Sequence, residues 1–227
     1  MAQPEPRRQV LADTVHDTIR QRLLEHAIEP GSKLNINALA LELEVSPTPV
    51  REALARLEAD GLVLKRTLAG YTAAPLLSGQ EFDELFELRM LLEPAAAARA
   101  AERADAADLR ALAGQLAEMR EARAAGPDRA LQSFVRQDAL FHDRIAAAGG
   151  NGLLRGSLER LHAHTHLYRL YFREGIAEET CREHERILDT LREHDADAAA
   201  ATMRTHLRRA RERLLGALPE ALPDAAR

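Results

Sequence analysis

Two side chains in the stretch DALFHDRI have the types and the spacing needed to bind a metal ion. Asp138 and His142 are four residues apart, so a helix would place both on one face, where they could converge on one ion. A carboxylate combined with imidazole nitrogens suits a divalent metal such as zinc, nickel or manganese. Two histidines from neighbouring helices would complete the protein ligands. Such a site could leave coordination positions for water or for the carboxylate of a small ligand.

Other interpretations of these histidines are open from the residues alone. An isolated Asp-x-x-x-His pair is more often a structural or surface pair than a metal site. The stretch HAHTH forms a competing cluster, in which His162 and His166 are four residues apart with His164 between them. One of these histidines could instead line a ligand pocket or lie exposed on the surface.

The stretch SPTPVREALARLEADG predicts a helix whose first turn could bind DNA. Pro47 and Pro49 cost little at a helix start, because the first backbone N–H groups have no partner within the helix. Those N–H groups are joined by the hydroxyls of Ser46 and Thr48 and by the guanidinium of Arg51. Such a helix tip suits a phosphate group or the edge of a base.

The elements expected around this tip make a winged helix-turn-helix. Apolar residues at helical spacing predict a first helix over 10–28 and a short second helix over 36–43, which a tight turn joins to the helix that starts at Pro47. Residues 61–66 then read as a strand, 67–70 as a hairpin tip and 71–73 as the returning strand.

The charge balance restricts how such a domain could bind nucleic acid. The chain has a net charge of −5, and residues 1–75 hold nine Lys or Arg against ten Asp or Glu. DNA contacts must therefore come from individually placed cations rather than from a basic surface. The candidates are Arg51, Arg56, Lys65 and Arg66, with Arg7 and Arg8 near the N-terminus.

The rest of the chain is expected to be entirely helical. Ala, Leu, Arg and Glu dominate the composition, which favours helices over sheets. Ser78 and Glu81 fit a capping box that opens the first of six helices, so we expect domains over 1–75 and 81–227 joined by a linker over 76–80. The six expected helices cover 79–103 with a kink near Pro94, 105–124, 127–147, 151–173, 177–193 and 196–217. The predicted fold class is therefore mainly α, a winged helix followed by a six-helix bundle.

The composition also indicates a soluble cytoplasmic protein with no membrane partner. Cys181 is the single cysteine, so no intrachain disulfide is possible, and a reducing compartment fits. No apolar run approaches the roughly 18 residues of a membrane-spanning helix. The N-terminal residues MAQPEPRRQ lack the apolar core of a signal peptide.

Several stretches resemble one family of bacterial regulators. SPTPVREALARLEADGLV closely resembles the recognition-helix signature of GntR-family transcription regulators, and the match continues to a wing glycine, Gly70. The C-terminal half resembles the all-helical ligand-binding domain of the FadR subfamily, called FCD, and is similar to its shorter, six-helix branch. The matching stretches are FELRMLLEPAAAARAA (86–101), DALFHDRI (138–145), EHERIL (183–188) and DADAAAATMRTHL (195–207).

The resemblance implies a homodimeric regulator, usually a repressor, that binds a palindromic operator in double-stranded DNA. Its DNA affinity would change when a small organic acid binds. The resemblance also places metal ligands at His184 and His206, so we predict a divalent metal site. The predicted ligands are Asp138, His142, His184 and His206, and the predicted DNA-binding residues are Ser46, Thr48, Arg51, Arg56, Lys65, Arg66 and Gly70.

Two residues depart from the pattern of many relatives. Pro47 stands between the Ser and Thr of the signature where many relatives have an arginine, and Asn37 stands where some have an arginine in the second helix. Both changes affect positions that could contact bases, so the operator of a relative is not expected to transfer to this chain.

Arg89 and the metal site each admit a second interpretation. Arg89 could project into the pocket and meet an anionic effector, or it could form an ion pair with Glu93, four residues on.

The leading hypothesis for function is a metal-containing, ligand-responsive DNA-binding regulator. A metal-dependent enzyme using the Asp/His site is the alternative. An enzyme would leave the winged helix unexplained, and the sequence offers no dependable general base beside that site.

Overall fold

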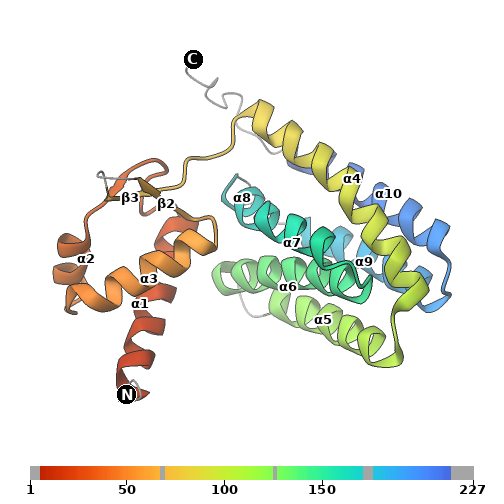
Figure 1. Ribbon diagram of the computed structural model, residues 1–227, viewed down its shortest axis with the longest axis horizontal. Coiled ribbons are helices and arrows are strands. Elements are labelled where there is room, and N and C mark those ends of the chain that lie inside the picture. The colour runs from red at the N-terminus through yellow and green to blue at the C-terminus, as the bar shows by residue number, and fades with distance from the viewer. Residues whose placement is uncertain (1–5, 67–69, 125–126, 171–175, 216–227) are drawn as a thin grey trace. The chain divides into compact units, whose positions relative to one another are not determined.

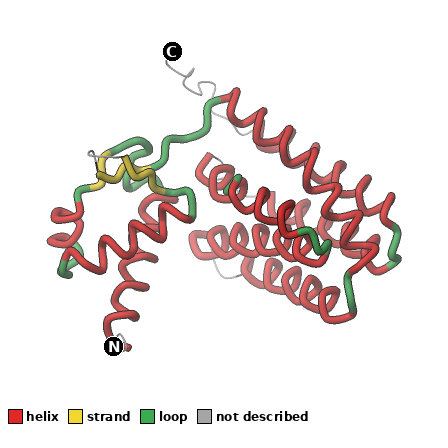
Figure 2. The backbone as a smooth tube through the Cα atoms, viewed as in Figure 1, coloured by secondary structure: helices red, strands yellow, loops and turns green. Residues whose placement is uncertain are grey.

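The computed structural model describes residues 6–66, 70–124, 127–170 and 176–215. The chain divides into two compact units, one that includes residues 6–76 and one made of most of the described residues from Leu77 onward. Short strands occur only in the first unit among the described residues, and the second is built from helices (Figure 1, Figure 2). The expected mainly α class, a winged helix followed by a helical bundle, is confirmed.

The first unit has three helices and a small antiparallel sheet. The strand order is β1-β3-β2, and Thr72 of the central strand lies opposite both Lys33 and Leu64. The apolar faces of α1 and α3 supply the core, where Ile19, Leu54 and other side chains are fully buried. The elements are α1 (Pro6–Leu24), β1 (Lys33–Leu34), α2 (Ile36–Glu42), α3 (Pro47–Ala59), β2 (Val63–Arg66) and β3 (Gly70–Ala73).

Local chemistry sets both ends of α3. Proline occupies the first turn, where its missing N–H costs nothing, and Ser46 is the N-cap residue. At the other end Gly61 has a φ of 73°, a left-handed conformation that favours glycine. The N–H of Leu62 then donates to the carbonyl of Leu57 at 2.9 Å, which closes the helix before β2.

Two features of the first unit differ from the sequence-based expectation. The first helix covers Pro6–Leu24 instead of residues 10–28, and a turn follows it. The short strand β1 was not expected; it pairs with β3 and extends the two-stranded wing to three strands. The expected hairpin tip lies largely at residues 67–69, outside the described residues.

The second unit is a helical bundle in which α4 and α10 lie side by side (Figure 1). The capping box at the start of α4 is confirmed, because the N–H of Glu81 donates to Ser78 Oγ at 3.2 Å and the Ser78 N–H donates to Glu81 Oε2 at 2.8 Å. The helices are α4 (Gly79–Arg103), α5 (Ala106–Ala124), α6 (Pro127–Ala148), α7 (Gly152–Arg160), α8 (Ala163–Leu170), α9 (Ile176–Arg192) and α10 (Ala196–Leu215).

The prediction of a single helix over 151–173 is wrong. The chain forms α7 and α8 instead, and the break falls at Leu161 and His162. His162 has a φ of 45°, outside the helical region, so the helix cannot continue through it. As a result, the described residues of the second unit contain seven helices where six were expected. The helical assignment of α4 continues through Pro94 without a break.

The core of the helical unit lies between α4, α5, α6, α9 and α10. Phe141, Ile187 and Leu207 are almost fully buried there, together with small alanines that let α4 approach its neighbours. Three of these helices, α6, α9 and α10, also carry buried histidines. No helix among the described residues combines the length and apolar character needed to cross a lipid bilayer.

Candidate metal centre

Three histidines from three helices converge inside the second unit. His142 comes from α6, His184 from α9 and His206 from α10, and their ligand nitrogens all lie within 4.8 Å of one another. Their exposed fractions are 6%, 0% and 3%. Imidazole nitrogens gathered this closely in a buried site match the ligand type that transition metals prefer.

Asp138 lies one helical turn before His142 and joins the same group of side chains. Its Oδ1 is 3.4 Å from His184 Nε2, and its Oδ2 accepts a hydrogen bond from His164 Nδ1 at 2.7 Å. Asp138, His142 and His164 form a second group whose ligand atoms lie within 4.8 Å of one another. The structure therefore brings together all four predicted ligands and adds His164 of α8.

Several polar atoms of this cluster have no hydrogen-bond partner in the described structure. These are Asp138 Oδ1, His142 Nε2 and both ring nitrogens of His184. A buried polar group without a partner costs about 1–3 kcal/mol. A metal ion that took these atoms as ligands would remove that cost, so the donor set fits a divalent cation.

Two buried glutamates hold the outer nitrogens of the histidines. Glu93 Oε2 accepts from His142 Nδ1 at 2.5 Å, and Glu183 Oε2 accepts from His206 Nδ1 at 2.9 Å. A carboxylate in this position orients the ring, fixes its tautomer and raises its basicity as a ligand. The other ring nitrogen of each histidine, Nε2, is thereby left for the metal.

Each glutamate is itself held by an arginine. Arg89 Nε donates to Glu93 Oε1 at 2.5 Å, and both residues are buried. Arg213 donates to both oxygens of Glu183, at 2.8 and 2.9 Å. The ion pair that the sequence allowed between Arg89 and Glu93 is thus formed, and it places Arg89 behind His142.

The ionisation of these groups favours metal binding. Burial lowers the pKa of His142 to about 4, although the carboxylate of Glu93 opposes this shift. Burial, together with the nearby His206, also holds the pKa of His184 well below its usual value. Neutral imidazole is the form that coordinates metals, so at neutral pH these two side chains are ready to bind.

The pKa values of Asp138 and Glu183 are lowered, which also favours binding of a cation. Burial raises the pKa of Asp138, but the charge and hydrogen bond of His164 outweigh it, and the pKa lies well below the usual value. Burial likewise opposes ionisation of Glu183, yet hydrogen bonds from His206 and Arg213 lower its pKa to about 2. Both carboxylates are therefore charged and can counter the charge of a cation.

The competing HAHTH cluster does not assemble as a unit. The His162 and His166 ring centroids are 6.4 Å apart, and neither residue belongs to a group of potential ligands among the described residues. Only His164 turns toward Asp138 and His142. His162 lies in the break between α7 and α8, whereas His164 and His166 both lie on α8. Asn151 caps α7, accepting from the N–H of Leu154 at 3.1 Å.

The predicted DNA-binding residues gather on the first unit. Ser46, Thr48 and Arg51 are exposed at the first turn of α3, and Ser46 makes no side-chain capping bond. Gly70 opens β3 with a φ of 83°. Arg56, Lys65 and Arg66 are exposed, but Arg56 donates to Asp13 Oδ1 of α1 at 2.6 Å, and Lys65 Nζ lies 5.9 Å from the ring centroid of Tyr71.

Three residues of the metal centre were not predicted as parts of it. Glu93 was considered only as a partner for Arg89, and its position four residues on was the one available signal. Glu183 directly precedes His184, but a helix turns adjacent side chains in different directions, so the sequence did not link it to His206. His164 was assigned to the competing cluster, and only the chain path brings it to Asp138.

Comparisons with known families cover most of the chain. Residues 11–71 match the family model of bacterial regulatory proteins of the gntR family, and residues 84–209 match that of the FCD domain. GntR-type regulators bind DNA operators, and FCD domains bind small-molecule effectors and metal. The two matches correspond to the winged-helix unit and the helical unit described above.

Individual relatives and solved structures agree with this assignment. The regulator LutR of Bacillus subtilis is 30% identical over 85% of this chain and 96% of its own length. A putative L-lactate dehydrogenase operon regulatory protein of Escherichia coli is 31% identical over 89% of this chain and 84% of its length. The structure of E. coli McbR/YncC is similar with a TM-score of 0.70 and 25% identity, covering 91% of this chain and 97% of that one.

These relatives are transcriptional regulators and not enzymes, so the alternative of a metal-dependent enzyme is not retained. The winged helix has a role in such a regulator, because the gntR-type unit binds DNA. The chain belongs to the GntR family of bacterial transcriptional regulators and carries an FCD domain.

Proposed function

We propose that this regulator is a repressor whose affinity for its operator is controlled by a small organic acid bound at a divalent metal. The observation that carries the proposal is the convergence of His142, His184 and His206 within 4.8 Å, with buried ligand atoms that lack a hydrogen-bond partner. A cluster of this kind is unfavourable in a core unless a ligand completes it.

The protein residues that would hold the metal are Asp138, His142, His184 and His206. They supply one carboxylate oxygen and three imidazole nitrogens, a donor set that suits zinc, nickel or manganese. When bound, the metal would supply a Lewis acid whose open positions attract a carboxylate. The hydrogen bonds of Glu93 to His142 and of Glu183 to His206 would hold these two rings in place as ligands.

The class of effector is supported by the names of two relatives. One is a putative regulatory protein of an L-lactate dehydrogenase operon, and another is the gluconate operon transcriptional repressor of Bacillus subtilis, 28% identical over 130 residues. Lactate and gluconate are both hydroxy acids with one carboxylate. A carboxylate binding to the metal of this chain would be consistent with that chemistry, and the second name supports the repressor role.

Arg89 is an unsuitable partner for the effector as the side chains are arranged. Its Nε donates to Glu93, and only 2% of the residue is exposed. A buried arginine that left this carboxylate would strand a charge in the core, which costs several kcal/mol. We infer that Arg89 acts on the site through Glu93 and His142.

Operator recognition is assigned to the first turn of α3 and to the wing. Ser46, Thr48 and Arg51 are exposed there, so two hydroxyls and a guanidinium are available beside the positive end of the helix dipole. Phosphate contacts would set the register, and Arg51 would read a base edge in the major groove. Arg56, Lys65, Arg66 and Gly70 would contribute at the edge of this surface.

Control would follow from coupling between the two sites in a homodimer bound to a palindromic operator. If the effector and the operator favour different arrangements of the protein, each lowers the affinity for the other by the same free energy. Two-fold symmetry of the protein would require two-fold symmetry of the DNA site.

Fluorescence anisotropy on operator DNA tests this proposal. Upstream DNA of the gene itself serves as the probe, and lactate, gluconate and other hydroxy acids are added to the protein–DNA complex. We expect at least one acid to weaken operator binding about fivefold or more. The same acid should have no effect on the His184→Ala variant, while His166→Ala should respond as the wild type does. Release of DNA by an acid regardless of His184 would overturn the role of the metal.

A further inference from the structure

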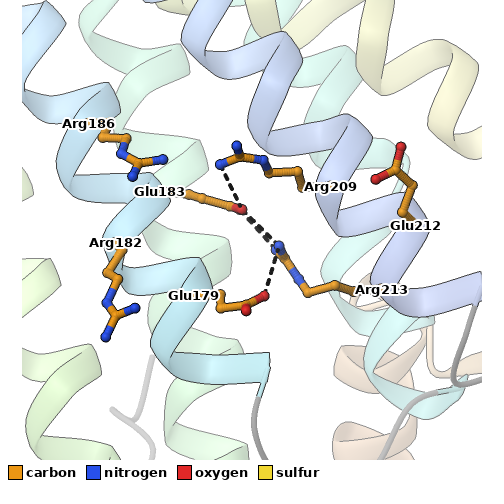
Figure 3. A pocket seen from close by; sticks show the side chains of 7 residues that line it. All are labelled: Glu179, Arg182, Glu183, Arg186, Arg209, Glu212 and Arg213. Atoms are coloured by element: carbon orange, nitrogen blue, oxygen red, sulfur yellow. Dashed lines mark hydrogen bonds and ion pairs between the residues drawn. The ribbon is translucent and has the colours of Figure 1, made fainter.

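A pocket of about 350 Å³ opens between α9 and α10, on the outer side of Glu183 (Figure 3). A volume of this size is sufficient for a small organic molecule. Four arginines line it, two from each helix, and they outnumber its three glutamates by one charge. The arginines are Arg182, Arg186, Arg209 and Arg213.

The glutamates of the pocket are not equally free to neutralise these arginines. Glu183 already accepts from Arg213 through both oxygens and from His206, so its lone pairs are largely taken. Glu179 Oε2 lies 3.8 Å from Arg213 Nη1. Arg213 therefore makes most of the contact with Glu179 and Glu183, the two glutamates of α9 that line the pocket.

Two of the arginines make no side-chain hydrogen bond to any described residue. Arg186 is exposed and makes no ion pair or side-chain hydrogen bond to any described residue. Arg209 reaches Glu183 Oε1 only at 3.8 Å, beyond hydrogen-bond distance. Figure 3 shows both guanidinium groups turned toward the space between the helices. Arg182 is less available, because it is paired with Glu178 in the preceding turn.

We propose that this pocket binds a small multivalent anion, a phosphate ester or a di- or tricarboxylate, through Arg186 and Arg209. Guanidinium groups present paired N–H donors that match carboxylate and phosphate oxygens, and two such groups select for more than one negative charge. The same chemistry recognises both classes of anion, so the pocket is defined by charge and by spacing.

Glu183 connects this pocket to the histidine cluster. An anion that draws Arg209 and Arg213 toward itself would leave Glu183 with His206 as its principal partner. A carboxylate freed in this way makes the imidazole a stronger metal ligand. The anion would therefore raise the affinity of the neighbouring site for metal. This consequence rests on the metal site proposed above, whereas binding of the anion does not.

Isothermal titration calorimetry on the full-length protein tests the binding. The probes are inorganic phosphate and tricarballylate, at constant ionic strength, with wild type beside Arg186→Ala/Arg209→Ala. The matched control is Arg204→Ala/Arg208→Ala, which removes the same charge from exposed positions of α10 outside the pocket. We expect the pocket variant to weaken binding at least tenfold, in line with charge-assisted hydrogen bonds, and the control to match the wild type.

The two probes also distinguish the sources of the anion. Preference for phosphate would identify a phosphate ester, and preference for tricarballylate a multivalent carboxylate. Absence of binding for both probes would overturn the proposal, as would equal affinities in wild type and pocket variant. A carboxylate bound at the metal would persist in the pocket variant, so the difference between the two proteins reports the pocket alone.

The link to the histidine cluster has its own measurement. Metal affinity is determined by competition with a chelator, with and without phosphate, in wild type and in Arg186→Ala/Arg209→Ala. We expect phosphate to tighten metal binding about fivefold in the wild type only. Equal metal affinity in all four conditions would refute the link. Failure of the wild type to bind metal at all would refute the metal site instead and leave the anion result standing.

Discussion

The two units of this regulator assemble their functional side chains in opposite ways. The tip of α3 takes Ser46, Thr48 and Arg51 from six consecutive residues and leaves them exposed. The candidate metal centre gathers its potential ligands from three helices, buries the histidines and orients two of them with the carboxylates of Glu93 and Glu183. A change at the tip should therefore affect one contact, whereas a change at the metal centre should spread through a network.

The largest expected effect is the loss of a ligand in the buried centre. His184 lies 0% exposed, and its Nε2 is 3.4 Å from Asp138 Oδ1. We expect His184→Ala to lower metal affinity more than about 100-fold, since a ligand contributes more than its supporting partners do. Chelator competition measures this affinity, and His166→Ala is the matched control. A loss of less than about tenfold would show that the metal, if bound, lies elsewhere.

The next largest effect is expected at Glu93, a residue that contacts a ligand without being one. Glu93→Gln keeps the size of the side chain but removes the charge that orients His142 and pairs with Arg89. Loss of such a partner typically costs about 10–100-fold in metal affinity, and we expect a value in this range. Circular dichroism of the metal-free variant checks that the fold persists. Unchanged metal affinity in a folded variant would reduce Glu93 to a structural ion pair.

Acid should destabilise the metal-free helical unit through its buried histidines. The pKa of His142 falls from 6.5 to about 4 on folding, so the unfolded chain takes up more protons between these values. Stability from this group is complete above pH 6.5 and is lost as the pH falls toward 4. From pH 7.5 to pH 5 we expect the free energy of unfolding to drop by about 2 kcal/mol, measured by urea denaturation. A His142→Asn variant should show a smaller drop, and an equal drop would exclude His142 as the cause.

The smallest effects are expected at the exposed tip. Arg51→Ala should weaken operator binding about tenfold with little change in stability, because its side chain is exposed. Arg56→Ala should weaken binding less, since Arg56 is paired with Asp13, and an exposed pair of this kind contributes less than about 1 kcal/mol. Anisotropy titrations and thermal melts of both variants compare them directly. A larger effect for Arg56 would move the centre of recognition away from the first turn of α3.

Sequence reasoning succeeded where the relevant residues are close along the chain. The helix start at Pro47, the capping box of Ser78 and the shared face of Asp138 and His142 all follow from spacings of a few residues. His184 and His206 required the resemblance to a family, because nothing in their spacing shows which helices meet.

The remaining features depend on contacts between distant segments. Glu183 reaches His206 and His164 reaches Asp138 only because of how the helices pack. The break at Leu161 and His162 contains no glycine or proline that would predict it. Packing in the folded chain outweighs the helical propensity of this segment. Arg186 and Arg209 lie on different helices, and only the packing of α9 against α10 brings them to one pocket.

The most direct test of the central claim is the metal content of purified, tag-free protein by elemental mass spectrometry. Wild type is compared with His142→Ala/His206→Ala and with His162→Ala/His166→Ala as the histidine-matched control. We expect about one divalent metal per chain in the wild type and in the control, and loss of the metal in the first variant. Equal metal in all three proteins, or none in the wild type after reconstitution, would contradict the central claim.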